Sequence, residues 1–210
     1  ANTRAAATHA GRDGITPLMY AALYGTAQSM RALLDAGADP NARNEAGATA
    51  LMWAVDDAAK TSLLLSRGAD AKAKSLDGRT VLMIAAGRAG SSPILTMLLN
   101  KGADPNVDLA DLTALGEAAY VADVEAMRLL LARGADPKRG LMLSIGTAAE
   151  ADCVPCLELL LPSLTPEQQK RVALSVLPPD DDGDELALLL DRGAGVDAAD
   201  RAGRTVRQLA

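Results

Sequence analysis

The sequence predicts an all-α solenoid built of short helix pairs, and three observations support this fold class. The tripeptide Gly-Ala-Asp recurs at nearly constant spacing, beginning at Gly37, Gly68, Gly102 and Gly134. A second phrase, Thr-x-Leu, keeps the same spacing of about 33 residues and begins at Thr16, Thr49, Thr80 and Thr113. Hydrophobic residues make up 49% of the 210 residues but aromatic residues only 2%, so the helices must pack through small side chains.

Each repeated unit predicts two helices and a turn, as the first complete unit shows. Thr16 is a favourable N-cap, and Pro17 stands where a missing N–H costs nothing, so a first helix starts here and ends at Gly25. A second helix follows and ends at Gly37, the left-handed position expected after a helix. Gly47 then supplies a tight turn. Because one unit exposes apolar surface on both flanks, it is stable only when stacked on its neighbours.

The sequence motifs of these units resemble those of a known protein family. Asp-x-x-Gly-x-Thr-Pro-Leu, Ala-Ala-x-x-Gly, Leu-Leu and Gly-Ala-Asp-Pro-Asn follow one another in register. Together they resemble the ankyrin repeat, in a form similar to bacterial ankyrin repeat domains. The resemblance implies a β-turn finger followed by two antiparallel helices in each unit. It is good over residues 11–137, weakens beyond them, and resumes near Gly193 and Gly203.

We expect a single ankyrin-repeat solenoid over residues 1–210. Its predicted parts are a remnant of a preceding repeat (1–10), four well-matched repeats (11–137), two degenerate repeats (138–198) and a truncated last repeat (199–210). Fingers are predicted near residues 10–15, 43–48, 74–79, 107–112 and 199–204, and none between 138 and 186. Neither end offers a polar capping unit, so we expect the sequence to be a piece of a longer protein.

Residues 138–186 keep helices but lose the Gly-x-Thr-Pro finger. Residues 141–151 and 154–161 predict one helix pair, and Thr165 predicts the capped start of another helix that ends before Pro178. The acidic run 180–185 predicts a further helix start, because carboxylates complement the positive end of a helix dipole.

Metal sites and catalytic sites are not predicted. The chain has one histidine, His9, so a histidine-based catalytic pair or a multi-histidine metal site cannot be assembled. If the acidic run 180–185 were a calcium loop, Pro178 and Leu189 would have to supply oxygen ligands, which their side chains lack. No unit combines an acid, a base and a nucleophile, so we expect no enzyme activity and no cofactor.

Cys153-Val-Pro-Cys156 is the one motif with suggestive chemistry. Its spacing matches redox Cys-x-x-Cys motifs, and a helix start lowers the pKa of a thiol. Residue 157 is leucine, which excludes covalent haem attachment, and the βαβ context of a thioredoxin is missing. Three interpretations stay open for this pair: plain packing thiols, a local disulfide in an exported protein, or a redox role.

The few aromatic residues can be placed individually. Tyr20 and Trp53 share one phase, just before the alanine that closes the Thr-x-Leu-x-x-Ala phrase, and we expect both in the core. Tyr24 and Tyr120 come later on their first helices. By the family resemblance their phases face the concave groove, where an exposed tyrosine is a typical binding anchor. The alternative is that these tyrosines merely cover the next unit.

The charge balance bounds the partner. The chain has 21 basic and 27 acidic residues, a net charge of −6, and no basic stripe. Nucleic acid is therefore not the expected ligand, and a basic or mixed protein surface fits better. The sequence has no run of apolar residues long enough to span a membrane, and it leaves open whether the protein is cytoplasmic or exported. We expect a monomer.

By the family resemblance, this solenoid binds another protein, or an adjacent domain of its own polypeptide, through its concave finger and first-helix face. The residues expected on this face are Arg12, Asp13, Tyr24, Glu45, Asp56, Asp57, Asp77, Arg79, Arg88 and Tyr120. Two alternatives remain. One is a redox-responsive module centred on Cys153 and Cys156. The other is an adaptor arm of a larger bacterial protein that carries a fused enzyme or haem domain.

Overall fold

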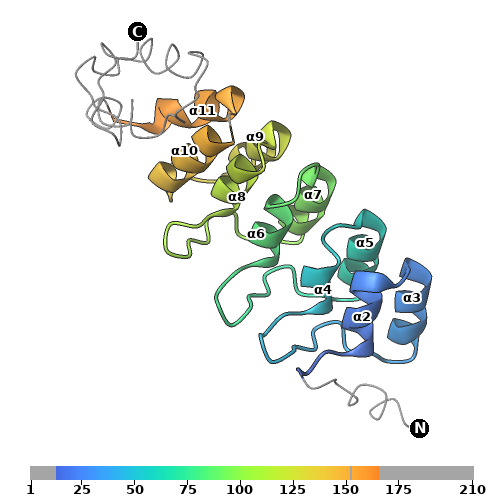
Figure 1. The fold of residues 1–210 in the computed structure, drawn as a ribbon. Coiled ribbons are helices and arrows are strands. Elements are labelled where there is room, and N and C mark those ends of the chain that lie inside the picture. The colour runs from blue at the N-terminus through green and yellow to red at the C-terminus, as the bar shows by residue number, and fades with distance from the viewer. Residues whose placement is uncertain (1–12, 152, 166–210) are drawn as a thin grey trace.

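A computed structural model describes residues 13–151 and 153–165, which form an elongated row of antiparallel helix pairs (Figure 1). The pairs are α2 (Pro17–Tyr24) with α3 (Ala27–Asp35), α4 (Ala50–Trp53) with α5 (Ala58–Ser66), α6 (Val81–Ala86) with α7 (Ser92–Asn100), α8 (Ala114–Tyr120) with α9 (Val124–Ala132), and α10 (Leu141–Glu150) with α11 (Val154–Leu160). A short 3-10 helix, η1 (Leu161–Ser163), follows α11. Residues 13–151 and 153–165 contain isolated β-bridges but no sheet, which confirms the predicted all-α solenoid.

The first helices begin at the threonines that the sequence predicts as caps. The hydroxyl oxygens of Thr16, Thr80 and Thr113 accept a hydrogen bond from the backbone N–H three residues later, at 3.3, 3.1 and 3.1 Å. These bonds satisfy donors that a helix start leaves unpaired. Thr49 differs, because its hydroxyl oxygen is buried and has no partner among the described residues. The helix after it, α4, has only four residues.

The core runs along the row between the helix pairs. The leucines two residues after the cap threonines are at most 1% exposed: Leu18, Leu51, Leu82 and Leu115. The second helices α3, α5, α7 and α9 each contribute a large apolar residue with 0% exposure, for example Met30, Leu64, Leu98 and Leu130. Burying each such side chain stabilises the fold by about 1.5–3 kcal/mol. Small residues fill the spaces between first helices, where Ala85 and Ala118 are also 0% exposed.

Hairpin turns project from one side of the row at three of the predicted finger positions, 43–48, 74–79 and 107–112 (Figure 1). Each is closed by a backbone hydrogen bond of 3.0 Å, from Asn44 to Ala48, from Ser75 to Arg79 and from Leu109 to Leu112. The finger predicted at 10–15 is described only from Asp13 onward. The finger predicted at 199–204 lies outside the described residues.

Glycine is replaced in the fourth finger without loss of the turn. Gly47 and Gly78 have φ angles of 73° and 90°, in the left-handed region that glycine adopts without strain. The equivalent residue in the fourth finger is Asp111, with a φ of 71°. Its N–H donates to Oδ1 of Asp108 at 2.8 Å. The local hydrogen bond holds an aspartate in a backbone conformation that usually requires glycine.

In the described part of the chain, no finger precedes α10. The segment after Gly134 runs through turns to Gly140, which has a φ of 57°. A β-carbon on Gly140 would lie 1.9 Å from the carbonyl oxygen of Asp111, so the backbone passes directly against the fourth finger. The helices α10 and α11 then follow, close to the predicted pair 141–151 and 154–161. The helix starts predicted at Thr165 and at 180–185 lead into residues outside the described ones.

Asparagine side chains join the loops of neighbouring repeats. Nδ2 of Asn41 donates to the carbonyl oxygen of Gly68 at 2.8 Å, and its Oδ1 accepts from the N–H of Asp70 at 2.8 Å. Asn106 repeats this arrangement with the carbonyl oxygen of Gly134 at 2.8 Å and with the N–H of Asp136 at 2.6 Å. These two asparagines act as clips, each tying one Gly-Ala-Asp loop to the next.

Candidate binding surface

The fingers and the first helices form one continuous surface, which we call the ledge. It comprises residues 13–16, the three fingers, the helices α2, α4, α6 and α8, and the turns after α4 and α6 that hold Asp56, Asp57 and Arg88. Figure 1 shows the fingers on one side of the first helices and the second helices on the other. Backbone hydrogen bonds connect successive fingers, from Glu45 to Asp13 at 3.1 Å and from Leu76 to Ala46 at 2.9 Å. The spacing of these fingers along the ledge is therefore held by the main chain.

One position of the first helices faces the fingers. It is the fourth residue after the cap threonine, and we call its occupants the inner row: Tyr20, Trp53, Ile84 and Glu117. Glu117 shows the direction of this position, because its Oε1 lies 2.5 Å from Nη2 of Arg79 at the end of the third finger. The inner row is aromatic in the first two repeats, aliphatic in the third and acidic in the fourth.

The expectation that Tyr20 lies in the core is wrong. Its side chain is 50% exposed, and its ring stacks on Tyr24 with centroids 6.4 Å apart. Trp53 is only partly buried and packs against the edge of the core. The reason is helical geometry, because the fourth position lies about 200° around the helix from the leucine at the second position. The leucine contacts the neighbouring helices, so the fourth residue points away from them and toward the fingers.

Three of the predicted carboxylates lie on successive fingers. Asp13, Glu45 and Asp77 are all exposed. The hydroxyl of Ser75 donates to the Asp77 carboxylate and lowers the pKa of Asp77, with a further contribution from the N–H of Arg79. Asp77 therefore stays ionised well below neutral pH. Each of these fingers presents a carboxylate to solvent, and the second and third fingers also expose a basic side chain, Arg43 and Lys74.

The predicted tyrosine anchors are exposed at the ends of their helices. Tyr24 is 78% exposed on α2, and Tyr120 is 62% exposed on α8. Asp57 has a local role, because its Oδ1 accepts the N–H of Ala59 at 2.9 Å and caps α5. Arg12 lies outside the described residues. Leu23, next to Tyr24, is 44% exposed and was not among the predicted residues. It comes three residues after the exposed Tyr20, so both lie on the same side of α2.

Two arginines of the ledge are paired with carboxylates of neighbouring repeats. Nε of Arg88 lies 3.1 Å from Oδ1 of Asp56, and both side chains are more than half exposed. Arg79 pairs with Glu117, whose side chain is only 12% exposed. Glu117 was not predicted as a ledge residue, because it shares the phase of Tyr20, which the sequence analysis expects in the core. The structure thus brings four of the ledge residues together as two ion pairs that neutralise the middle of the surface.

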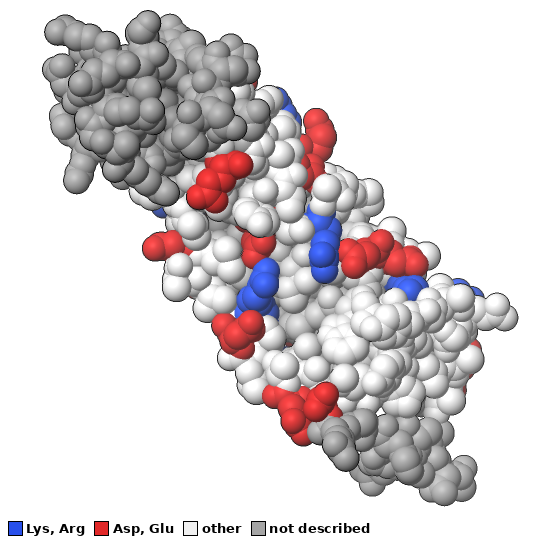
Figure 2. All heavy atoms as spheres, viewed as in Figure 1, with Lys and Arg blue, Asp and Glu red and all other residues white. Residues whose placement is uncertain are grey.

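Figure 2 shows how the charges are distributed on one face of the described residues. Basic side chains occur there as separate groups next to acidic ones, and they do not join into a stripe. Such an arrangement differs from the continuous basic surface typical of proteins that bind nucleic acid through phosphate contacts.

Comparison with known families explains this architecture. A family model described as "Ankyrin repeats (3 copies)" matches residues 2–74 and 56–140, which together are more than half of the chain. The chain belongs to the ankyrin repeat family. Ankyrin repeats are generally non-enzymatic modules for protein–protein interaction.

A solved structure supports the same fold. The human ASB11 ankyrin repeat domain superimposes with a TM-score of 0.77, covering 93% of this chain and 92% of that domain, at 24% sequence identity. At this identity the similarity concerns the fold alone. The ankyrin architecture nevertheless accounts for the ledge, since a finger and a first helix recur in every regular repeat.

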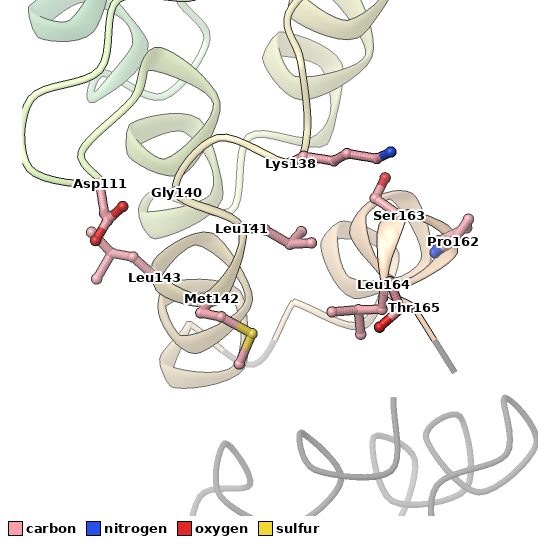
Figure 3. Close-up of a pocket in the computed structure, with 10 residues that line it drawn as sticks. All are labelled: Asp111, Lys138, Gly140, Leu141, Met142, Leu143, Pro162, Ser163, Leu164 and Thr165. Atoms are coloured by element: carbon pink, nitrogen blue, oxygen red, sulfur yellow. The ribbon is translucent and has the colours of Figure 1, made fainter. Parts of the chain in front are cut away.

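A cavity lies where the regular ankyrin repeats end. It has a volume of about 600 Å³ and lies between the first turn of α10 and the segment that follows α11. Figure 3 shows Leu141, Met142 and Leu143 on one side of it and Pro162, Ser163 and Leu164 on the other. The residues predicted for the ledge do not line this cavity.

Cys153 and Cys156 form a disulfide at the start of α11. Their side chains are buried, with exposures of 5% and 0%. The interpretation as two free packing thiols is therefore wrong, although both sulfurs do lie in the core. The same motif caps the helix, because the N–H of Cys156 lies 3.3 Å from the sulfur of Cys153.

Residues 13–151 and 153–165 contain neither a membrane-spanning helix nor a cluster of metal-binding side chains. The longest helix there, α10, has 10 residues, whereas a membrane span needs about 20, and no helix of this part is long and apolar enough to cross a bilayer. This part also contains no group of three or more His, Cys, Asp or Glu side chains that could hold a metal ion.

Proposed function

We propose that this chain is a non-catalytic binding scaffold that holds a protein partner, or an adjacent domain of its own polypeptide, along the ledge. The observation that carries the proposal is the group formed by Tyr20, Leu23 and Tyr24, which we call the aromatic patch. These three side chains lie on one short helix and are 50%, 44% and 78% exposed. Large apolar groups that stay in water on a rigid surface are typical of binding sites.

The chemistry of the aromatic patch suits recognition. Tyrosine offers a large contact area and loses little conformational entropy on binding, because it has few rotatable bonds. The stacked rings of Tyr20 and Tyr24 already hold each other in place. The capping box at Thr16 and the buried Leu18 and Met19 fix the helix that carries them. A partner would therefore meet a surface that needs little rearrangement.

The proposal is tested by capturing partners from the source cells with the whole chain as bait. Combined Tyr24→Ala and Tyr120→Ala substitutions should greatly reduce the proteins recovered, since both side chains are exposed on the ledge. The matched control carries Arg31→Ala and Arg128→Ala, two exposed changes on the second helices α3 and α9. Equal loss in the control, or full recovery with the folded tyrosine variant, would argue against the ledge.

A second candidate function is redox response at Cys153 and Cys156, and the disulfide between them supports it. Reduction would remove the crosslink at the start of α11 and change the packing of the last described helix pair. The two functions are separated by partner capture with and without a dithiol reductant. Recovery that changes with the reductant, and no longer does so in a Cys153→Ala, Cys156→Ala variant, would favour the redox function.

The fusion of this chain to an enzyme or haem domain remains a prediction. The scaffold would also serve as an adaptor arm if an enzyme or haem domain were fused to it, and the similarity to bacterial ankyrin domains prompts that idea. Measuring the mass of the endogenous protein with an antibody against this chain tests it. A mass near 21.6 kDa would exclude a fused domain.

A further inference from the structure

Another cavity lies between the second and third Gly-Ala-Asp loops, where the series of asparagine clips is interrupted. It has a volume of about 290 Å³ and is lined by Lys72 and Lys74 on one side and by Gly102 and Asp104 on the other. Lys72 occupies the position that holds the clip asparagine in the loops before and after it. This junction therefore lacks the side chain that ties the loops together at the neighbouring junctions.

Two backbone groups at this cavity lack the partner that their equivalents have. At the preceding junction, the carbonyl oxygen of Gly68 accepts a hydrogen bond from Asn41, and the N–H of Asp70 donates one to it. The junction that follows repeats both bonds. The equivalent groups here are the carbonyl oxygen of Gly102 and the N–H of Asp104, and neither forms a hydrogen bond within the described part of the chain. Both residues are exposed, so a ligand can reach them.

These two groups select the chemistry of the ligand. A carboxylate has no donor for the carbonyl oxygen of Gly102, and it would meet the carboxylate of Asp104. An ammonium group has no acceptor for the N–H of Asp104, and it would meet Lys72 and Lys74. A trans peptide bond directs its N–H and its carbonyl oxygen to opposite sides. A primary carboxamide presents a donor and an acceptor on one edge, as the side chain of Asn41 does.

We infer that this cavity binds a primary carboxamide, such as the side chain of an asparagine or a glutamine. The carboxamide nitrogen donates to Gly102, its oxygen accepts from Asp104, and the ligand takes the place of the missing clip. The exposed side chain of Lys72, whose Cε would lie 3.3 Å from a β-carbon on Gly102, moves aside on binding. A volume of about 290 Å³ is at the lower end of ligand sites and suits a single side chain. The site goes beyond the proposed function, because it uses no residue of the aromatic patch.

The test uses NMR titration of the full chain, because this method measures weak binding and reports its place. The probe is the tripeptide Ala-Asn-Ala with an acetylated N-terminus and a C-terminal N-methylamide, compared with Ala-Asp-Ala and Ala-Ser-Ala peptides that have the same ends. The signal of the Asp104 amide shows whether a peptide reaches the site. We expect Ala-Asn-Ala to shift this signal and to bind about tenfold or more tightly than either comparison peptide, since only it can pair with both backbone groups.

Propionamide, a carboxamide without a peptide, separates two sources of the ligand. Binding of Ala-Asn-Ala that is about tenfold or more tighter than that of propionamide assigns the site to a side chain of a protein partner. Equal affinity assigns it to a free small amide, and both results support a carboxamide site.

Two variants decide whether the ligand occupies the place of the missing clip. Lys72→Asn supplies a carboxamide from the protein itself, so it should abolish binding of Ala-Asn-Ala. Lys74→Asn is the matched control, because it makes the same change of charge at another exposed residue that lines the cavity. It should alter binding by less than about twofold. The NMR spectrum of each variant shows that it is folded.

The inference fails if the Asp104 amide signal stays in place when Ala-Asn-Ala is added. It also fails if Ala-Asp-Ala binds as tightly as Ala-Asn-Ala, because the site would then prefer an anion. Loss of binding in both lysine variants would overturn it too, since the removed positive charge, and not the filled clip position, would be the common cause.

Discussion

Lys72 lies across Gly102 at the position where Asn41 and Asn106 clip their neighbouring loops together. A β-carbon on Gly102 would be 3.3 Å from Cε of Lys72. The array therefore has a clip between the first and second Gly-Ala-Asp loops and another between the third and fourth, whereas a lysine occupies the position between the second and third.

Replacing Lys72 with asparagine should stabilise the protein. The new side chain would donate to the carbonyl oxygen of Gly102 and accept from the N–H of Asp104, as Asn41 does with Gly68 and Asp70. A net gain of about 0.5–1.5 kcal/mol is expected for hydrogen bonds of this kind. Urea denaturation of Lys72→Asn measures it. Asn106→Ala is the companion variant, expected to lose a similar amount, and an unchanged midpoint in both would show that the clips contribute nothing.

Asp111→Gly should also raise stability. Asp111 has a φ of 71°, and relief of the left-handed strain outweighs the extra flexibility that glycine gives the unfolded chain. The expected gain is about 0.5–1 kcal/mol. Thermal unfolding followed by circular dichroism checks it. A lower midpoint would show that the aspartate side chain makes a contact worth more than the strain.

Gly140→Ala is expected to be among the most damaging small substitutions. The added methyl group would meet the carbonyl oxygen of Asp111, which belongs to the main chain and cannot rotate away. A loss of about 2–5 kcal/mol combines the left-handed strain with the steric overlap. Gly134→Ala is the control, because Gly134 has a φ of 88° but nothing lies within 4 Å of its added carbon. It should lose only about 1–2 kcal/mol, and equal losses would show that the contact with Asp111 is relieved elsewhere.

The buried helices and the finger tips should respond very differently to truncation. Leu130 is 0% exposed on α9, so Leu130→Ala leaves a cavity and should cost about 2–5 kcal/mol. Leu76 is 79% exposed on the third finger, and Leu76→Ala should change stability by no more than about 0.5 kcal/mol. Chemical denaturation of the two variants decides. A large loss at Leu76 would mean that this finger is packed more tightly than its exposure indicates.

The disulfide gives a prediction that needs no mutation. Purified under non-reducing conditions and unfolded, the chain should show no free thiol to a labelling reagent, and two after reduction, because it has two cysteines in all. The closed loop is short, so the combined Cys153→Ala and Cys156→Ala variant should lose only about 2 kcal/mol. Two reactive thiols in the non-reduced sample would contradict the disulfide.

Sequence reasoning was most successful where a local rule decides the structure. Thr16, Thr80 and Thr113 begin helices because a hydroxyl acceptor at that point pairs with a backbone N–H that the helix start leaves without a partner. Gly47 and Gly78 mark fingers because few other residues tolerate their backbone angles. The helix pair after residue 140 could be predicted for similar reasons, from its apolar spacing.

Other features depended on partners distant in the chain. The pairing of Arg79 with Glu117 joins two repeats, and neither residue alone indicates it. The direction of Tyr20 was in principle accessible, since helical geometry separates it from Leu18. The expectation of a core position rests on its phase just before the alanine that closes the Thr-x-Leu-x-x-Ala motif, and that phase does not fix the direction of the side chain. The bonding of Cys153 to Cys156 could not be chosen from spacing, which suits packing, a disulfide and redox chemistry equally well.

The contact between Gly140 and Asp111 also determines where this protein could be lengthened by engineering. A consensus ankyrin repeat inserted between residues 106 and 107 would have a regular repeat on each side. Its finger could form the same contacts with the neighbouring fingers that the existing fingers form with one another. The same unit inserted after residue 137 would separate Gly140 from the finger against which it rests and leave α10 without its support. Modular extension of the array should therefore succeed upstream of this contact and fail directly behind it.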